Sequence, residues 1–138
     1  MKSNDWEAEY PELVRMLKAR LGNKQTCLEA LDAYEEVLRA IWDFAARLTS
    51  DKGARALLSR SVQLAGQDAP LVQEISIGEK GVDLAALRSR VSKAGLETPE
   101  VVDALTHLGV AIFHSFAEVT GDALTVPLLC QLKGYREE

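Results

Sequence analysis

The feature that most constrains this chain is a long helix-forming stretch, residues 98–132, that contains no lysine or arginine. Its apolar residues recur at three- and four-residue intervals, the spacing that places side chains on one face of an α-helix. Thr98 is a suitable N-cap, and Pro99 suits the first helical position because an N–H there would have no helical partner. We expect Gly121 to end this helix and Pro127 to interrupt a shorter helix after it, either through a kink or because that helix begins late.

The same helix-and-turn pattern occurs twice in the chain. When the sequence is shifted by 71 positions, residues 32–58 align with residues 103–129 without a gap, and nine of the 27 positions are identical. Both copies place a turn at the same point, Thr-Ser-Asp in the first and Thr-Gly-Asp in the second. The alignment predicts two duplicated helical hairpins, about 26–65 and 98–133, that bury their apolar faces against each other. The alternative is that two helices rich in alanine and leucine align through composition alone.

Local signals divide the first half of the chain into helices. Residues 1–22 are expected to form an arm and then a helix that starts near Pro11, a favourable first helical residue. A capping box that begins at Thr26 opens the next helix, whose apolar residues continue to about residue 49. A third helix, residues 52–64, is expected to end at Gly66.

The segment 66–97 reads as a connector between the two hairpin copies. Alternating apolar and polar residues around a Gly-Glu-Lys-Gly turn predict a small two-stranded β-hairpin near 74–84. Asp83 is a good N-cap for a further helix, and Gly95 is a good stop for it. The fold class that follows is all-α: one domain, residues 1–138, built as a bundle of five or six helices.

Composition and charge exclude several classes of protein. With 138 residues, 47% hydrophobic and 27% charged, the chain is long enough to bury a core and is typical of a globular domain. A net charge of −5 disfavours nucleic acid as a partner, and no apolar run is long enough to span a bilayer. The acidic N-terminal segment lacks the apolar core of a secretory signal. Because Cys27 and Cys130 match no disulfide or zinc pattern, we expect free thiols and a cytoplasmic location.

The two histidines are the strongest candidates for a binding site. The expected helix places His107 four residues after Asp103 and His114 four residues before Glu118, which predicts two polar pairs on one stripe. Seven residues separate the imidazoles by about 10.5 Å along a helix. One metal ion cannot bridge that distance with metal–nitrogen bonds of about 2 Å, so we predict no metal site. We also predict no cofactor; the alternative is a haem or other ligand that lies between the hairpins and uses one of the histidines.

No catalytic motif is found, and the sequence favours a non-enzymatic interaction or regulatory module. The apolar faces of both long helices look wider than one small bundle can cover, which predicts a homodimer with a self-complementary patch, or another protein as partner. Large aromatic side chains commonly anchor such interfaces. The candidate anchors are Trp6, Tyr10, Trp42 and Phe113.

The alternative function is a small-molecule sensor or carrier. In this hypothesis the ligand lies between the two hairpins, where an aromatic wall and an imidazole would contact it. The candidate residues are His107, His114, Trp42 and Phe113.

Overall fold

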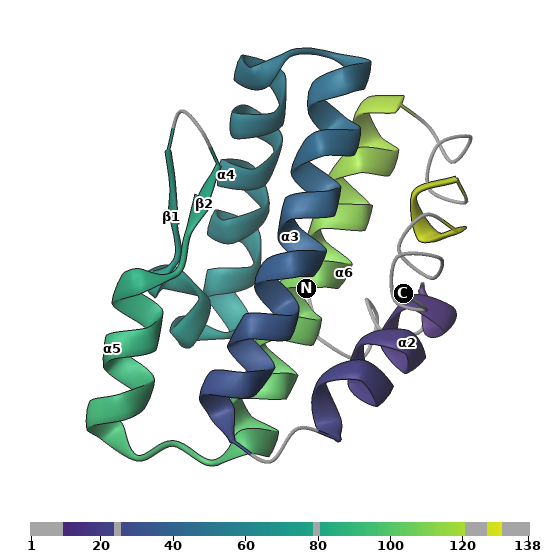
Figure 1. Ribbon diagram of the computed structural model, residues 1–138. Coiled ribbons are helices and arrows are strands. Elements are labelled where there is room, and N and C mark those ends of the chain that lie inside the picture. The colour runs from purple at the N-terminus through teal and green to yellow at the C-terminus, as the bar shows by residue number, and fades with distance from the viewer. Residues whose placement is uncertain (1–9, 24–25, 79–80, 121–126, 131–138) are drawn as a thin grey trace.

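The fold is a helical bundle with a small β-hairpin at one side, as the sequence predicts (Figure 1). The structure, a computed structural model, describes residues 10–23, 26–78, 81–120 and 127–130. In these residues the elements are α2 Pro11–Gly22, α3 Cys27–Leu48, α4 Asp51–Asp68, the 3-10 helix η1 Pro70–Glu74, β1 Ser76–Ile77, β2 Val82–Asp83, α5 Ala85–Ala94 and α6 Thr98–Thr120. Residues 127–130 form one further helical turn. The predicted anchor Trp6 lies outside the described residues.

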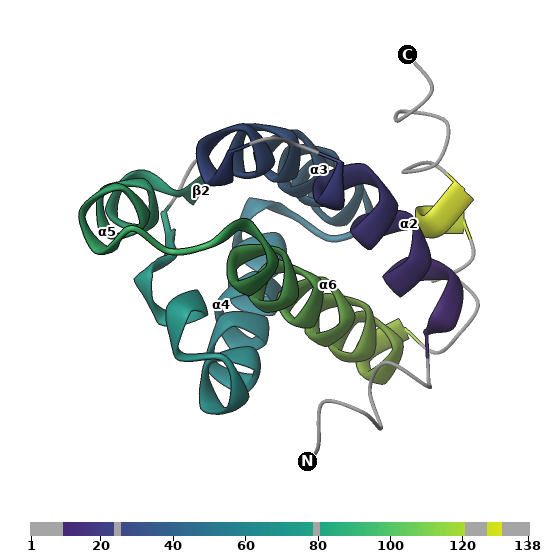
Figure 2. The same cartoon turned by 90° about the horizontal axis from the view of Figure 1, so that it is seen from below.

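Helix α6 occupies the centre of the bundle. Viewed from below, it lies between α3, α4 and α2 (Figure 2). Every residue from Ala104 to Phe113 is buried. This span has no Asp, Glu, Lys or Arg, so neighbouring helices can cover all its sides without burying an unpaired charge. Residues 104–113, in the middle of the stretch without lysine or arginine, therefore lie in the hydrophobic core of the bundle.

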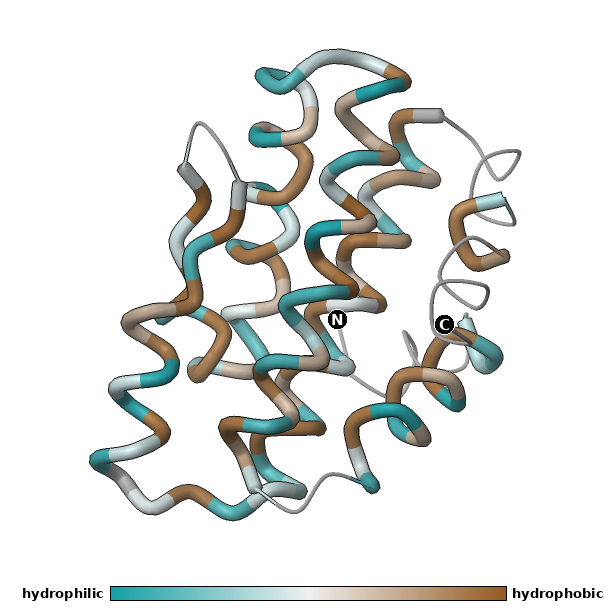
Figure 3. The backbone as a smooth tube through the Cα atoms, viewed as in Figure 1, coloured by the Kyte–Doolittle hydropathy of each residue, from teal (hydrophilic) through white to brown (hydrophobic). Residues whose placement is uncertain are grey.

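Helix α3 runs beside α6 in the same direction and keeps one side in solvent (Figure 1). Its N-terminus has the predicted capping box: the Thr26 side chain accepts from the Glu29 N–H, and the Glu29 side chain accepts from the Thr26 N–H. Hydrophilic and hydrophobic residues alternate along it (Figure 3). The buried side includes Leu31, Tyr34 and Leu38, each at most 2% exposed. Helical periodicity thus predicted both the start and the buried face of α3.

Helix α4 runs antiparallel to α3 and α6 and is longer than predicted. Gly66, the expected stop, is buried inside the helix, which continues to Asp68. A Cβ on Gly66 would lie 2.7 Å from the Gln73 Cγ, so the missing side chain lets η1 approach α4 closely. The Gln73 Nε2 also donates to the Gly66 carbonyl oxygen at 2.9 Å. Gly66 therefore serves helix packing rather than helix termination.

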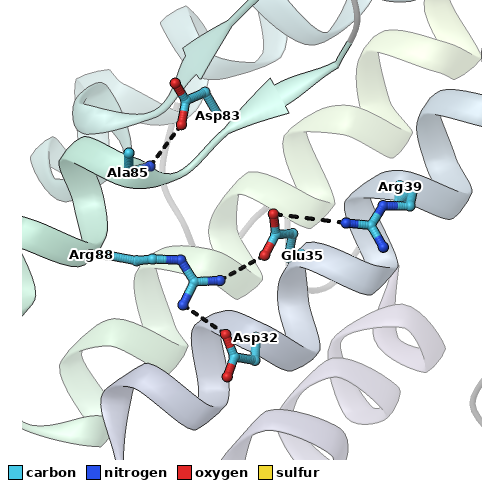
Figure 4. Close-up of polar contacts among 6 residues, drawn as sticks. All are labelled: Asp32, Glu35, Arg39, Asp83, Ala85 and Arg88. Atoms are coloured by element: carbon cyan, nitrogen blue, oxygen red, sulfur yellow. Dashed lines mark hydrogen bonds and ion pairs between the residues drawn. The ribbon is translucent and has the colours of Figure 1, made fainter.

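The predicted β-hairpin and the helix after it are both present. Ser76 pairs with Asp83 in an antiparallel register, and the Asp83 side chain accepts from the Ala85 N–H at 2.9 Å, at the start of α5. Gly95 ends α5 with φ 64°, the left-handed conformation that glycine adopts at low cost. Arg88 of α5 reaches across to α3 (Figure 4).

The predicted start of α2 is confirmed, whereas the predicted N-cap of α6 is corrected. Helix α2 starts at Pro11, as predicted. Helix α6 begins at Thr98 itself, because the Val101 N–H donates to the Glu97 carbonyl oxygen. Thr98 is thus a helical residue, and Pro99 occupies the second position instead of the first.

The predicted duplication stays a prediction. The first hairpin copy corresponds to α3 and α4, but residues 121–126 and 131–133 of the second copy lie outside the described residues. The described part of that copy is α6 and the helical turn 127–130.

Candidate functional site

A pocket of about 540 Å³ lies where the end of α4, η1, the segment before α6 and the first turns of α6 come together. Its lining combines charged side chains with an apolar wall. The lining residues are Lys18, Asp68, Ala69, Pro70, Leu71, Arg90, Leu96, Glu100, Asp103, Ala104 and His107. A concave site of this size falls in the range typical of small-molecule pockets.

The walls of the pocket are held by local contacts. Pro70 starts η1 directly after α4, and the Ala69 N–H donates to the Ala65 carbonyl oxygen at 2.8 Å, which closes the last turn of α4. Val72 of η1 is 1% exposed, so η1 is anchored in the core. The chain therefore turns sharply at the pocket wall, and Asp68 lies at the end of α4 beside α6.

His107 is the buried polar residue of this site. It is 4% exposed, and its Nε2 lies 3.5 Å from the Asp68 Oδ2. Because carbonyl dipoles make the C-terminal end of a helix negative, Asp68 and the end of α4 both present negative potential to the imidazole. The sequence paired His107 with Asp103. The structure gives it an acidic neighbour from another helix, Asp68, and Asp103 is an exposed residue of the same pocket.

The charged groups around the pocket are of both signs. Asp68, Glu100 and Asp103 supply carboxylates, and Lys18 and Arg90 supply cations. The guanidinium of Arg90 also lies 3.1 Å from the Glu74 carboxylate, outside the lining. The site can therefore offer hydrogen bonds and ion pairs to a polar ligand while an apolar wall covers another part of it. Among the described residues, none of those that line the pocket carries a hydroxyl or thiol group that could act as a serine- or cysteine-type nucleophile.

The predicted pair of His114 and Glu118 is confirmed, and neither residue lines this pocket. The His114 Nε2 lies 3.4 Å from the Glu118 Oε2 on the same helix. Glu118 also accepts from Arg60 of α4 at 2.6 Å. His114 thus belongs to a half-buried polar cluster between α4 and α6.

The predicted aromatic residues have different neighbours. Phe113 is 1% exposed, and its ring meets that of Tyr10 edge-on at 5.9 Å and 72°. Trp42, 8% exposed, borders two hollows on the outer side of α3 whose linings contain neither Phe113 nor His114. The structure thus brings Tyr10 and Phe113 together within one chain and places Trp42 at a separate surface.

Sequence reasoning singled out His107 and its helix neighbour Asp103 and missed the other residues of the pocket. Asp68, Lys18 and Arg90 come from three other helices and are distant from His107 in sequence. The available signal was His107 itself: an imidazole on an otherwise apolar helix requires a polar partner when it is buried. Sequence spacing could not show which helix supplies that partner.

Comparisons with models of protein families, with curated proteins and with solved structures find no match to this chain. Among the described helices, none is long and apolar enough to cross a bilayer. Within the same residues, no group of three or more His, Cys, Asp or Glu side chains is arranged to hold a metal ion. The geometry of the site is therefore the basis for a functional proposal.

Proposed function

We propose that this protein is a non-enzymatic regulatory module that binds a small polar ligand in the pocket beside His107. The observation that carries the proposal is a nearly buried imidazole that lines the pocket and lies 3.5 Å from the Asp68 carboxylate. Buried polar groups form stronger hydrogen bonds than exposed ones because less water competes for them. A ligand in this pocket would therefore meet a defined polar group next to an apolar wall.

A regulatory role follows from the elements that the pocket joins. Lys18 belongs to α2, Asp68 to α4, Arg90 to α5 and Asp103 to α6. A ligand that contacts all four helices stabilises one arrangement of them. Binding to the folded state alone adds about 2.7 kcal/mol of stability when the free ligand is about 100-fold above its dissociation constant. Ligand binding would thus be coupled to the packing of the central helix.

Native mass spectrometry of the purified protein tests the proposal first, because it detects a retained ligand directly. Thermal unfolding with a panel of free amino acids, small amines and small carboxylates then tests added ligands. We expect one class to raise Tm. Asp103→Lys reverses a charge on the pocket wall at an exposed position, so it should abolish the rise for an amine and increase it for a carboxylate.

Glu12→Lys is the matched control for this experiment. It makes the same change of charge at an exposed position of α2, outside the pocket lining. The control should keep the full ligand response. A protein without retained mass, whose Tm responds to none of the panel, would contradict the proposal, as would an equal loss of response in both variants.

The predicted homodimer stands as a second proposal. Its first argument, a surplus of apolar surface, finds little support in the burial of the helices. Of the large apolar residues in the described segments, those that are exposed are Leu28, Leu48 and Val119. The charged side chains on the outer side of α3 favour self-association.

Cys27 and Cys130 are free thiols, which is compatible with the cytoplasmic location that we also propose.

A further inference from the structure

A trough runs along the outer side of α3. One hollow of about 330 Å³ lies between α3 and the start of β2, at Gly81 and Val82. A second hollow of about 500 Å³ extends to Asp51 at the start of α4. The two hollows share Trp42 and Asp43, so they adjoin one another. Among the described residues, neither shares a lining residue with the pocket beside His107.

Two parallel rows of α3 side chains form the floor and rim of this trough. Both rows have a spacing of four residues, which aligns side chains in a ridge along a helix surface. The apolar row is Leu38, Trp42 and Ala46. The charged row is Glu35, Arg39, Asp43 and Arg47, and its charges alternate in sign from one end to the other.

The charged row is accessible, and one end of it is held in place. The Arg39 side chain is 65% exposed, and its guanidinium lies 3.9 Å from the Glu35 carboxylate, a loose contact. Arg88 of α5 bonds the other oxygen of Glu35 at 2.7 Å, and also bonds Asp32 (Figure 4). Glu35 is therefore fixed at the hairpin end, while Arg39 remains able to meet a charge from outside the chain.

We propose that this trough binds the α3 helix of a second copy of the chain, with the two helices antiparallel. The order of the charges selects this arrangement. When two copies meet about a twofold axis near the middle of the row, Glu35 faces Arg47 of the second copy, and Arg39 faces Asp43. All facing pairs then have opposite charges. In a parallel, in-register arrangement, every residue of the row would face its own copy and repel it.

The apolar row supports the same arrangement. Rows with four-residue spacing on two helices interdigitate at a crossing angle of about −50°, a common packing class in globular proteins. Trp42 is 8% exposed, so it lines the floor and does not protrude. The trough is complementary in charge to its own copy.

The test is a pair of complementary variants studied by native mass spectrometry and sedimentation. We expect the wild-type protein to dimerise, and more weakly at high salt, since exposed ion pairs are screened. Arg39→Glu places Glu opposite Asp43, and Asp43→Arg places Arg opposite Arg39. Each variant alone should lose dimer affinity by about tenfold or more, because two like-charged pairs form across the twofold axis.

Mixing the two variants provides the decisive result. In a mixed dimer, Glu at position 39 faces Arg at position 43, and the native pair faces on the other side of the axis. A heterodimer should therefore form from two proteins that do not dimerise alone. Arg55→Glu, an equal change of charge at an exposed site of α4, is the control and should stay dimeric.

Three outcomes would overturn the proposal. The first is a wild-type protein that stays monomeric at every concentration and salt, which would leave a different partner, or none, for the trough. The second is a wild-type dimer that both single variants preserve, which would place the interface elsewhere. The third is a mixture of the variants that yields no heterodimer. Circular dichroism of each variant verifies that the exposed substitutions leave the helices intact.

Discussion

Helices α3 and α6 are similar in length and sequence but differ in environment. They contain 22 and 23 residues and run side by side in the same direction. The row Glu35, Arg39, Asp43 and Arg47 on α3 corresponds, after the shift of 71 positions, to Thr106, Val110, His114 and Glu118 on α6. The α3 row lines a surface trough, whereas Thr106 and Val110 are fully buried.

Because the two helices share an apolar face, the side chains on the opposite face decide whether a helix lies at the surface or at the centre of the bundle. Both helices carry apolar residues at the three- and four-residue spacing. Four alternating charges on the remaining row keep one side of α3 in water. The uncharged residues in the middle of α6 allow α2, α3 and α4 to surround it.

Val110→Arg should have the largest effect, because it copies the α3 residue Arg39 into the corresponding position of α6. Val110 is 0% exposed, so the new guanidinium would be buried without a partner. We expect the free energy of unfolding to fall by about 3–5 kcal/mol in urea denaturation. The reverse change, Arg39→Val, is the control and should alter it by less than about 0.5 kcal/mol at protein concentrations low enough for both proteins to be monomeric. Equal losses in the two variants would refute the contrast between the helices.

Tyr34→Phe tests the contact of α3 with α6. Tyr34 is 0% exposed, and its hydroxyl has no hydrogen-bond partner among the described residues. A buried hydroxyl without a partner costs about 1–3 kcal/mol, so the variant should be more stable than wild type by an amount in this range at neutral pH. Chemical denaturation at pH 7 measures the difference. A clear loss of stability would show that the hydroxyl makes a favourable interaction.

The same residue gives a pH dependence with a defined sign. Burial raises the pKa of Tyr34 far above its usual value near 10. Above pH 10 the unfolded chain releases this proton, but the native state retains it, so stability falls as pH rises. The slope for one proton is about −1.4 kcal/mol per pH unit. Below pH 10 both states hold the proton, and the contribution is constant. The wild-type protein should show this extra alkaline loss of stability, and Tyr34→Phe should not.

Thr26→Ala tests how the two helices begin. Thr26 caps α3 through the reciprocal hydrogen bonds with Glu29, and its loss should cost about 0.5–2 kcal/mol. The shift of 71 positions pairs Thr26 with Glu97, and Thr98, one residue later, is a helical residue whose hydroxyl lies 3.8 Å from the Cys27 Sγ. Thr98→Ala should therefore cost less than Thr26→Ala in the same thermal unfolding experiment. A larger loss of stability in Thr98→Ala than in Thr26→Ala would indicate that Thr98 is the N-cap of α6, as the sequence predicted.

Arg88→Gln should have the smallest effect on global stability. Partial burial alone would lower the pKa of Arg88, but its bonds to Asp32 and Glu35 outweigh that effect and raise the pKa. Because both carboxylates are more than one-third exposed, we expect a loss of less than about 1 kcal/mol. Amide exchange in α5 should accelerate more than exchange in α6. Arg90→Gln, which removes an exposed pair with Glu74, is the control. Uniform acceleration in both helices would show that Arg88 supports the whole core.

Sequence reasoning worked where the signal and the structure lie within one helical turn or one hairpin. The capping box at Thr26, the left-handed stop at Gly95, the hairpin and the His114/Glu118 pair are all local features, and the structure contains each of them. It failed at Gly66, which has the properties of a helix stop but is held inside α4 by its packing on Gln73. A glycine at a helix end and one at a close helix contact look the same in a sequence.

The class of fold, the positions of most helix ends and His107 as a candidate binding residue could all be predicted from the amino-acid sequence. These depend on backbone propensity, capping and apolar spacing, which act over a few residues. Only the tertiary structure decided that Asp68 is the acidic neighbour of His107, that Tyr10 packs on Phe113 and that Trp42 faces a trough. The physical reason is that side-chain partners are chosen by how helices pack, and distant residues meet only after the chain has buried its core.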